Sequence, residues 1–161
     1  MSQKFRIITR SDLDGIVCAA LLREIGMVDE VKYAHPKDMQ DGTIEVTSND
    51  IIANLPYHPN AHIVFDHHAS EVERTKTPPK NVINDPTAPS AAYVIYRHYG
   101  GAAKFPNISK DLMDATNKID AAQLSEAEIL NPQGWVLLGF IMDNRTGLGR
   151  FRTYRISNYE L

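Results

Sequence analysis

The chain has 161 residues, of which 43% are hydrophobic and 23% are charged, and its formal net charge at pH 7 is -3. These values are typical of one soluble globular domain. The single cysteine, Cys18, excludes an internal disulfide framework and a cysteine-based zinc site, and it suits a reducing compartment. No apolar run is long enough to span a bilayer, and residues 1–4 lack the apolar segment of a signal peptide. We therefore expect a cytoplasmic protein without a membrane anchor.

The first half of the chain is predicted to begin with a strand and a long helix. Residues 5–9 form an apolar run typical of a strand, and residues 13–26 carry apolar side chains three and four positions apart, which predicts a helix with one buried face. Residues 31–34 are predicted to form the next strand, and residues 43–47 alternate like a further short one. The run 50–55 is too short for its periodicity to distinguish a strand from a helix. We favour a strand because prolines bracket the loop after it.

The second half of the chain continues the alternation. Apolar runs at 63–65 and 81–84 predict two more strands. A helix is predicted to open within 85–90 and to end at a pair of glycines. Further helices are predicted at 109–122 and at 135–142, the latter apolar enough to be buried. Alternating strands and helices predict an α/β fold with a largely parallel sheet flanked by helices.

Acidic and imidazole side chains follow two of the predicted strands. Asp12 and Asp14 lie in the turn after the first strand, and Asp66, His67 and His68 end a later one. In an open parallel sheet, ligands bind in the crevice at the carboxyl ends of the strands. Carboxylates and imidazoles at that edge suit a divalent metal ion. An isolated Asp-His-His is equally compatible with a surface turn, so the hypothesis of a metal site depends on both clusters together.

Several segments match the motifs of a known family. The runs at 12–15 (Asp-Leu-Asp-Gly) and 66–70 (Asp-His-His-Ala-Ser) together resemble the DHH superfamily of phosphoesterases. The segment 85–92 is similar to the stretch that follows the Asp-His-His motif in that family. The segments 35–42 and 54–57 most resemble an exopolyphosphatase-related branch of it.

The resemblance implies a single three-layer, Rossmann-like DHH domain over residues 1–161. The family usually carries a C-terminal domain that closes over the substrate, and we expect that 161 residues leave no room for it. It also implies one or two divalent metal ions, usually manganese with magnesium as the alternative, that activate a water molecule for in-line attack on phosphorus. The implied metal ligands are Asp12 on a first ion, Asp14 and His67 on a second, and the late aspartate Asp120.

The resemblance also implies catalytic and substrate-binding roles. The catalytic residues would be Asp66, His67 and His68, with His68 facing the substrate phosphate and Asp66 orienting the neighbouring histidine. Arg145 is a candidate for binding the remaining phosphate charge, as are Arg150 and Arg152, although all three also fit a solvated surface. Ser90 opens a helix whose N-terminus offers N–H groups to an anion, and plain capping explains it equally well.

Two positions depart from the family pattern, and a third is ambiguous. Arg10 stands where the family usually has a histidine, and Asn54 stands where it has an aspartate that bridges both metals. A neutral amide cannot bridge as a carboxylate does, and Asp50 could replace it only if the strand ends earlier. Both departures weaken the first metal site. The late aspartate is Asp120 or Asp143, and we favour Asp120.

The leading hypothesis is a metal-dependent phosphohydrolase or phosphodiesterase, exopolyphosphatase-like or acting on a small nucleotide, that uses a metal-activated water. The alternative is a degenerate DHH domain that binds a phosphorylated ligand or partner without hydrolysis, as Arg10 and Asn54 would favour. The expected partner is a small phosphorylated substrate such as polyphosphate, a nucleotide or a short oligonucleotide. Stable binding of a longer nucleic acid is not expected, because the net charge is negative and the sequence has no contiguous basic stripe. The sequence leaves the oligomeric state open.

Overall fold

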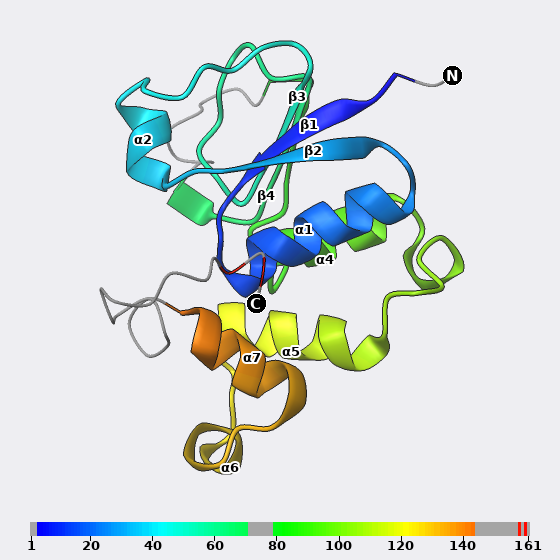
Figure 1. Cartoon of the computed structure of the whole chain (residues 1–161), viewed down its shortest axis with the longest axis vertical. Helices are drawn as coiled ribbons and strands as arrows, with labels where there is room; N and C mark the ends of the chain where they lie inside the picture. The colour runs from blue at the N-terminus through cyan, green and yellow to red at the C-terminus, as the bar shows by residue number, and fades with distance from the viewer. Residues whose placement is uncertain (1–2, 71–78, 144–157, 159, 161) are drawn as a thin grey trace.

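Five parallel strands form one sheet in the described part of this computed structural model, which comprises residues 3–70, 79–143, 158 and 160. Their order across the sheet is β2-β1-β3-β4-β5, and every neighbouring pair runs parallel (Figure 1). The α/β fold with a parallel sheet flanked by helices is thereby confirmed. The strands are β1 (Phe5–Thr9), β2 (Val28–Tyr33), β3 (Asp50–Ala53), β4 (Ile63–Asp66) and β5 (Val82–Asn84).

The central strands are buried on both faces of the sheet. Ile7 and Ile8 of β1 and Ile51 and Ile52 of β3 are all fully buried. Successive side chains of a strand point to opposite faces, so both faces must be covered. Ile7 and Ile51 belong to one buried cluster, and Ile8 and Ile52 belong to the other. This two-sided burial is why the strands appear in the sequence as continuous apolar runs.

Helices cover the first of these faces. α1 (Leu13–Glu24) and α4 (Ala91–His98) lie side by side against it (Figure 1). α5 (Lys110–Asp120) packs on α1, and α7 (Gly134–Met142) packs on α5. The connections contain the 3-10 helix η1 (Gly101–Ala103) and the short helix α6 (Glu126–Leu130).

The second face is covered by the short helix α2 (Pro36–Gln40) and by loops. Met39 of α2 packs with Val46, Leu55 and Ala61 from the loops in the second buried cluster.

Two segments differ from the expectation. Residues 43–47, predicted as a strand, form a loop that pairs with no described strand. Their alternation has another cause, because Val46 is buried in the second cluster between exposed neighbours. The segment after β2 forms the unexpected helix α2, since Pro36 is tolerated in the first helical turn and Nδ1 of His35 accepts a hydrogen bond from the Lys37 amide.

α7 forms as predicted but is only partly buried. Val136, Gly139 and Met142 are buried, whereas the side chains of Trp135 and Leu137 are 42% and 39% exposed. An apolar sequence alone does not indicate which face of a helix packs against the rest of the domain. α7 has nine residues, and none of the described helices is both long and apolar enough to cross a membrane.

The strand order reverses beside β1. β2 lies on one side of β1, and β3 returns to the other side. In parallel sheets, such a reversal opens a crevice at the carboxyl ends of the two strands. Asp12 follows β1, Asn54 follows β3 and Asp66 ends β4, so these side chains share one edge of the sheet.

Candidate metal centre

Three side chains from distant parts of the chain converge at this edge. Asp14 lies in the first turn of α1, His67 follows β4, and Asp120 is the last residue of α5. Their ligand atoms all lie within 4.8 Å of one another. Within residues 3–70 and 79–143, no other group of three acidic, histidine or cysteine side chains is close enough to share a metal ion. The structure thus brings together three of the four predicted metal ligands.

The Asp14 carboxylate is held by the N-terminus of α4. Oδ2 accepts a hydrogen bond from the Ala91 amide at 3.1 Å, and Oδ1 accepts one from the Ala92 amide at 2.8 Å. The side chain is buried, and burial together with the nearby Asp120 carboxylate raises the pKa of Asp14 to about 7. An ionised carboxylate in such surroundings needs a positive partner.

His67 presents its Nε2 atom to the two carboxylates. Nδ1 lies 3.3 Å from the carbonyl oxygen of Ala88, so in the neutral ring Nδ1–H donates to that oxygen and the lone pair is on Nε2. Nε2 is buried and lies 2.9 Å from Oδ2 of Asp120, and it forms no well-aligned hydrogen bond to any described residue. Burial lowers the pKa of His67, but the Asp120 and Asp14 carboxylates outweigh burial and raise it to about 9. Without a cation the ring would carry a proton, which a metal ion would replace.

The donor set fits a divalent metal ion. Carboxylate oxygens suit manganese and magnesium, and imidazole nitrogen is a common ligand of transition metals. A cation bound at Asp14, His67 and Asp120 would satisfy the buried Nε2 atom and neutralise the two carboxylates.

Asp66 and His68 form a second pair beside the metal cluster. Nδ1 of His68 lies 2.7 Å from Oδ1 of Asp66, and the rings of His67 and His68 are 4.5 Å apart between centroids. The Asp66 side chain is buried, whereas that of His68 is 42% exposed. The hydrogen bond to Asp66 raises the pKa of His68. The partly exposed ring is therefore held in place and kept cationic to higher pH.

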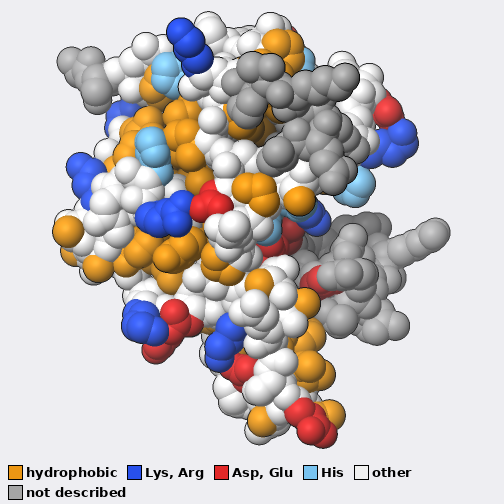
Figure 2. Space-filling view, turned by 180° about the vertical axis from the view of Figure 1, so that it is seen from behind, with side chains coloured by type: hydrophobic (Ala, Val, Ile, Leu, Met, Phe, Trp, Pro, Cys, Tyr) orange, Lys and Arg blue, Asp and Glu red, His pale blue; other side chains and the backbone are white. Residues whose placement is uncertain are grey.

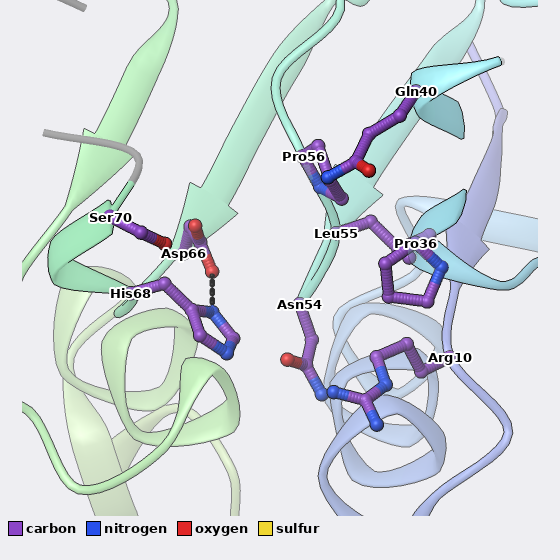
Figure 3. Close-up of a pocket in the computed structure, with 9 residues that line it drawn as sticks. All are labelled: Arg10, Pro36, Gln40, Asn54, Leu55, Pro56, Asp66, His68 and Ser70. Atoms are coloured by element: carbon purple, nitrogen blue, oxygen red, sulfur yellow. Dashed lines mark hydrogen bonds and ion pairs between the residues drawn. The ribbon is translucent and has the colours of Figure 1, made fainter. Parts of the chain in front are cut away.

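A pocket of about 120 Å³ lies beside Asp66 and His68, which form part of its lining. Its lining comes from the carboxyl ends of β1, β3 and β4 and from α2. Figure 3 shows Arg10 and Asn54 on one side of the pocket and the hydrogen-bonded Asp66 and His68 on the other. The lining residues are Arg10, Pro36, Gln40, Asn54, Leu55, Pro56, Asp66, His68 and Ser70.

Asp12, the fourth predicted ligand, lies outside the three-residue cluster. Its Oδ1 atom caps α1 by accepting a hydrogen bond from the Gly15 amide at 3.0 Å and accepts another from Nδ2 of Asn54 at 3.2 Å. Its Oδ2 atom lies 2.9 Å from Nε of Arg10. Both carboxylate oxygens thus already have partners within the chain.

Asp50 and Asp143 do not join the cluster. Asp50 begins β3 at the amino edge of the sheet, where it pairs with Nε of Arg6 at 2.6 Å and accepts a hydrogen bond from the Thr47 amide. This position excludes it as a replacement for the bridging aspartate. Asp143 caps the end of α7, and the described cluster contains Asp120 instead.

The two other predicted substrate-binding residues differ in outcome. Ser90 is fully buried, accepts a hydrogen bond from the Tyr93 amide as the cap of α4, and donates its hydroxyl to Oδ1 of Asn117. Its position supports capping rather than contact with a substrate. Arg145 lies outside the described residues, as do Arg150 and Arg152.

Several groups that hold the metal ligands in place left no mark in the sequence pattern. The carbonyl of Ala88 and the amides of Ala91 and Ala92 are backbone groups, which no residue type reveals. Asn84, whose Nδ2 atom donates to the carbonyl of His68 at 3.1 Å, also gave no signal. Two signals indicated that this segment belongs to the site: the resemblance over residues 85–92 and the helix N-terminus at Ser90, whose N–H groups could bind an anion.

No protein-family model matches the chain, and no curated protein matches it either. A solved structure with 15% identity, an uncharacterized protein from Helicobacter pylori G27, covers 86% of this chain and 47% of that chain with a TM-score of 0.45, which is too distant to carry an argument. The chain is far more similar to the pGpG-specific phosphodiesterase PggH from Vibrio cholerae, with 51% sequence identity and a TM-score of 0.84. The similarity covers 97% of this chain and 49% of that chain. The chain thus spans about half the length of PggH.

Proposed function

We propose that this chain is the DHH-type domain of a metal-dependent phosphodiesterase that acts on a small phosphorylated substrate. The proposal is supported mainly by two groups of side chains that lie next to each other at the carboxyl edge of one parallel sheet. These groups are the cluster of Asp14, His67 and Asp120 and the pocket-lining pair of Asp66 and His68. Two carboxylates and an imidazole, beside a histidine whose pKa is raised by a carboxylate, are suited to phosphoryl chemistry.

The similarity to PggH supports pGpG, or a related short nucleotide, as the first substrate to test. An exopolyphosphatase-like activity, expected from the resemblance of residues 35–42 and 54–57, stays a prediction that the comparisons do not test. The described part of the face in Figure 2 has basic and acidic side chains interspersed, without a continuous basic band. That surface favours a small substrate over a long nucleic acid.

The mechanism assigns separate tasks to the two groups. The Lewis acidity that activates water would come from a divalent ion held by Asp14, His67 and Asp120. His68 would donate a hydrogen bond to a phosphoryl oxygen, while Asp66 fixes the orientation and the charge of its ring. Hydrolysis adds the water oxygen to phosphorus, breaks the bond from phosphorus to the leaving oxygen, and returns a proton to that oxygen.

The direct test is hydrolysis by the purified, metal-stripped chain. pGpG, a generic phosphodiester and polyphosphate would each be supplied with and without manganese, and products would be separated by chromatography. We expect manganese-dependent cleavage of the dinucleotide that is lost in Asp14→Ala and His67→Ala and kept in a surface control, Asp41→Ala. Absence of turnover with manganese, magnesium or zinc would refute the proposal for this chain. Cleavage of polyphosphate alone would point instead to the exopolyphosphatase-like activity.

A second candidate is a binding module that recognises a phosphorylated ligand without hydrolysing it. The ion pair between Arg10 and Asp12 favours it, because this contact occupies a predicted metal ligand. Under this alternative, the chain would bind inorganic phosphate or pGpG in calorimetry and would leave the dinucleotide intact in the assay above. Binding together with turnover would reject it.

A further inference from the structure

Asp12 and Asp14 differ in what surrounds their carboxylates. Oδ1 of Asp12 accepts hydrogen bonds from the Gly15 amide and from Nδ2 of Asn54, and Oδ2 forms an ion pair with Nε of Arg10 at 2.9 Å. Asp12 is therefore neutralised by a cation of the chain itself. Asp14, by contrast, accepts hydrogen bonds from backbone amides, and among the described residues its only cationic neighbour is the shared His67. A metal ion has reason to bind at Asp14 and little reason to bind at Asp12.

The charges on the pocket side leave little attraction for a second cation. The guanidinium of Arg10 compensates Asp12, and Asn54 contributes an amide without charge. Asp66 is hydrogen-bonded to His68 at 2.7 Å, so it also has a partner that can carry positive charge. A divalent ion placed here would lie beside a permanent positive charge, and at short range such repulsion is strong in a partly buried site.

Arg10 and two unpaired oxygen atoms are directed to the same pocket. The Arg10 side chain is 38% exposed and lines the pocket on the side opposite His68 (Figure 3). Its guanidinium pairs with Asp12 through Nε, and the described residues offer its terminal nitrogens no other ion pair or hydrogen bond. Oδ1 of Asn54 and Oδ2 of Asp66 are buried, and neither has a hydrogen-bond partner in the part of the chain that the structure describes. Buried polar atoms without partners are rare, which indicates that a ligand or its water completes this pocket.

We propose that the site holds one divalent cation, at Asp14, His67 and Asp120, and that Arg10 supplies the second positive charge by binding a phosphoryl oxygen of the substrate. The substrate part of this inference rests on the proposed function, whereas the metal count does not. A guanidinium donates two parallel hydrogen bonds that match a phosphate and keeps its charge at every working pH. Arg10 is thereby a candidate catalytic residue, and its pairing with Asp12 holds the guanidinium at the rim of the pocket.

The metal count is the first test. Metal-free wild-type chain would be titrated with manganese by calorimetry, and the bound metal would be measured by elemental analysis after desalting. One equivalent per chain is the expected result, and two equivalents would overturn the proposal. The Arg10→Gln variant lacks the guanidinium charge that repels a second cation. In the same experiment this variant should bind the first equivalent, either alone or with a second equivalent of weaker affinity. Loss of the first equivalent in a folded Arg10→Gln variant would also overturn the proposal, since Arg10 would then be required for metal binding.

Anion binding is the second test, and it needs no turnover. Inorganic phosphate would be titrated into the magnesium-loaded chain. Arg10→Gln should weaken phosphate binding by roughly tenfold or more, because a charge-assisted hydrogen bond is lost, while Arg10→Lys should keep part of it. Arg23→Gln, at the far end of α1, is the matched control and should bind phosphate like the wild type. Equal phosphate affinity in wild type and Arg10→Gln would defeat the proposal.

These tests separate the inference from the proposed function. One metal equivalent with Arg10-dependent phosphate binding, but no hydrolysis of pGpG, would reject the proposed function and leave the inference standing for a binding module. Hydrolysis that requires two equivalents of manganese would support the proposed function and reject the inference. Thermal melting followed by circular dichroism would identify an Arg10→Gln variant that does not fold, and in that case the wild-type metal count and Arg10→Lys decide.

Discussion

The Nδ1 atom of His67 lies 3.3 Å from the carbonyl oxygen of Ala88, and this contact leaves Nε2 to face Asp120. Ala88 belongs to the connection between β5 and α4, and the Ala91 and Ala92 amides at the start of α4 hold Asp14. One short segment therefore orients two of the three candidate metal ligands. The metal centre depends on the packing of α4 as much as on the ligands themselves.

Replacing His67 with alanine tests the centre most directly. We expect metal affinity to fall by roughly 100-fold or more, because the loss of a direct ligand should cost at least as much as the loss of a group that orients one. Calorimetric titration with manganese would measure the change. His58→Ala is a suitable control, since His58 lies in the loop between β3 and β4 outside the cluster. An equal loss in both variants would argue against His67 as a ligand.

Asp14 should make the stability of the metal-free protein depend on pH. Burial raises the pKa of Asp14 to about 7 in the folded chain, against an ordinary value of 3.8. The folded state therefore favours the protonated carboxyl, and this stabilisation is complete below about pH 4 and is lost as the pH rises through about 7. We expect the Tm of the metal-free protein to fall between about pH 5 and about pH 8, and to fall less in Asp14→Asn. A rise in Tm over that range that Asp14→Asn also shows would contradict the assignment.

Metal binding should have the opposite pH dependence. Protons on Asp14 and His67, whose pKa values are raised to about 7 and about 9, must leave before these groups bind a cation. Manganese affinity is therefore expected to rise from about pH 6 to about pH 8, with proton release that calorimetry in two buffers of different ionisation enthalpy can count. Affinity that is constant over this range would be inconsistent with ligation by these two residues.

Asp66 is expected to act through His68. Asp66→Asn should lower turnover by roughly 10- to 100-fold with the metal count unchanged, as for other residues that orient a functional histidine. The Asp66 carboxylate raises the pKa of His68, so the imidazolium persists to higher pH in the wild type. The alkaline limb of the rate profile should therefore move to lower pH in Asp66→Asn. If the limb stays in place while turnover falls, Asp66 has only a structural role.

Gly15 is required by the close approach of the turn between β1 and α1. A Cβ atom there would lie 2.1 Å from the backbone oxygen of Arg10 and 2.8 Å from Oγ1 of Thr9. We expect Gly15→Ala to lower the free energy of unfolding by roughly 2 kcal/mol or more and to weaken metal binding, because the turn must shift. Gly139→Ala is the comparison, since its nearest obstacle is the flexible end of the Ile119 side chain. Urea unfolding of both variants would check the order, and a smaller loss in Gly15→Ala would contradict it.

Local patterns were sufficient for most of the elements. The helical spacing in residues 13–26 and the apolar runs at 5–9 and 63–65 correspond to α1, β1 and β4, because these segments bury a face that their own sequence makes apolar. The loop at 43–47 and the helix α2 were missed. In the loop, one buried side chain, Val46, between exposed neighbours produces the alternation that is typical of a strand. In α2, Pro36 follows the end of a strand and also begins a helix, so the proline alone does not distinguish the two.

The sequence by itself determined the residue types of the centre, since Asp12, Asp14 and the Asp-His-His triplet at 66–68 stand where strands end. Only the tertiary structure decided which of them meet. Packing of α5 beneath α1 brings Asp120 to His67, and the pairing of β3 with β1 puts Asn54 against Asp12, whereas the contact of Arg10 with Asp12 is local to one turn. The reason is physical: a metal site depends on distances of a few ångströms between residues far apart in sequence, and only the packing of the elements fixes those distances.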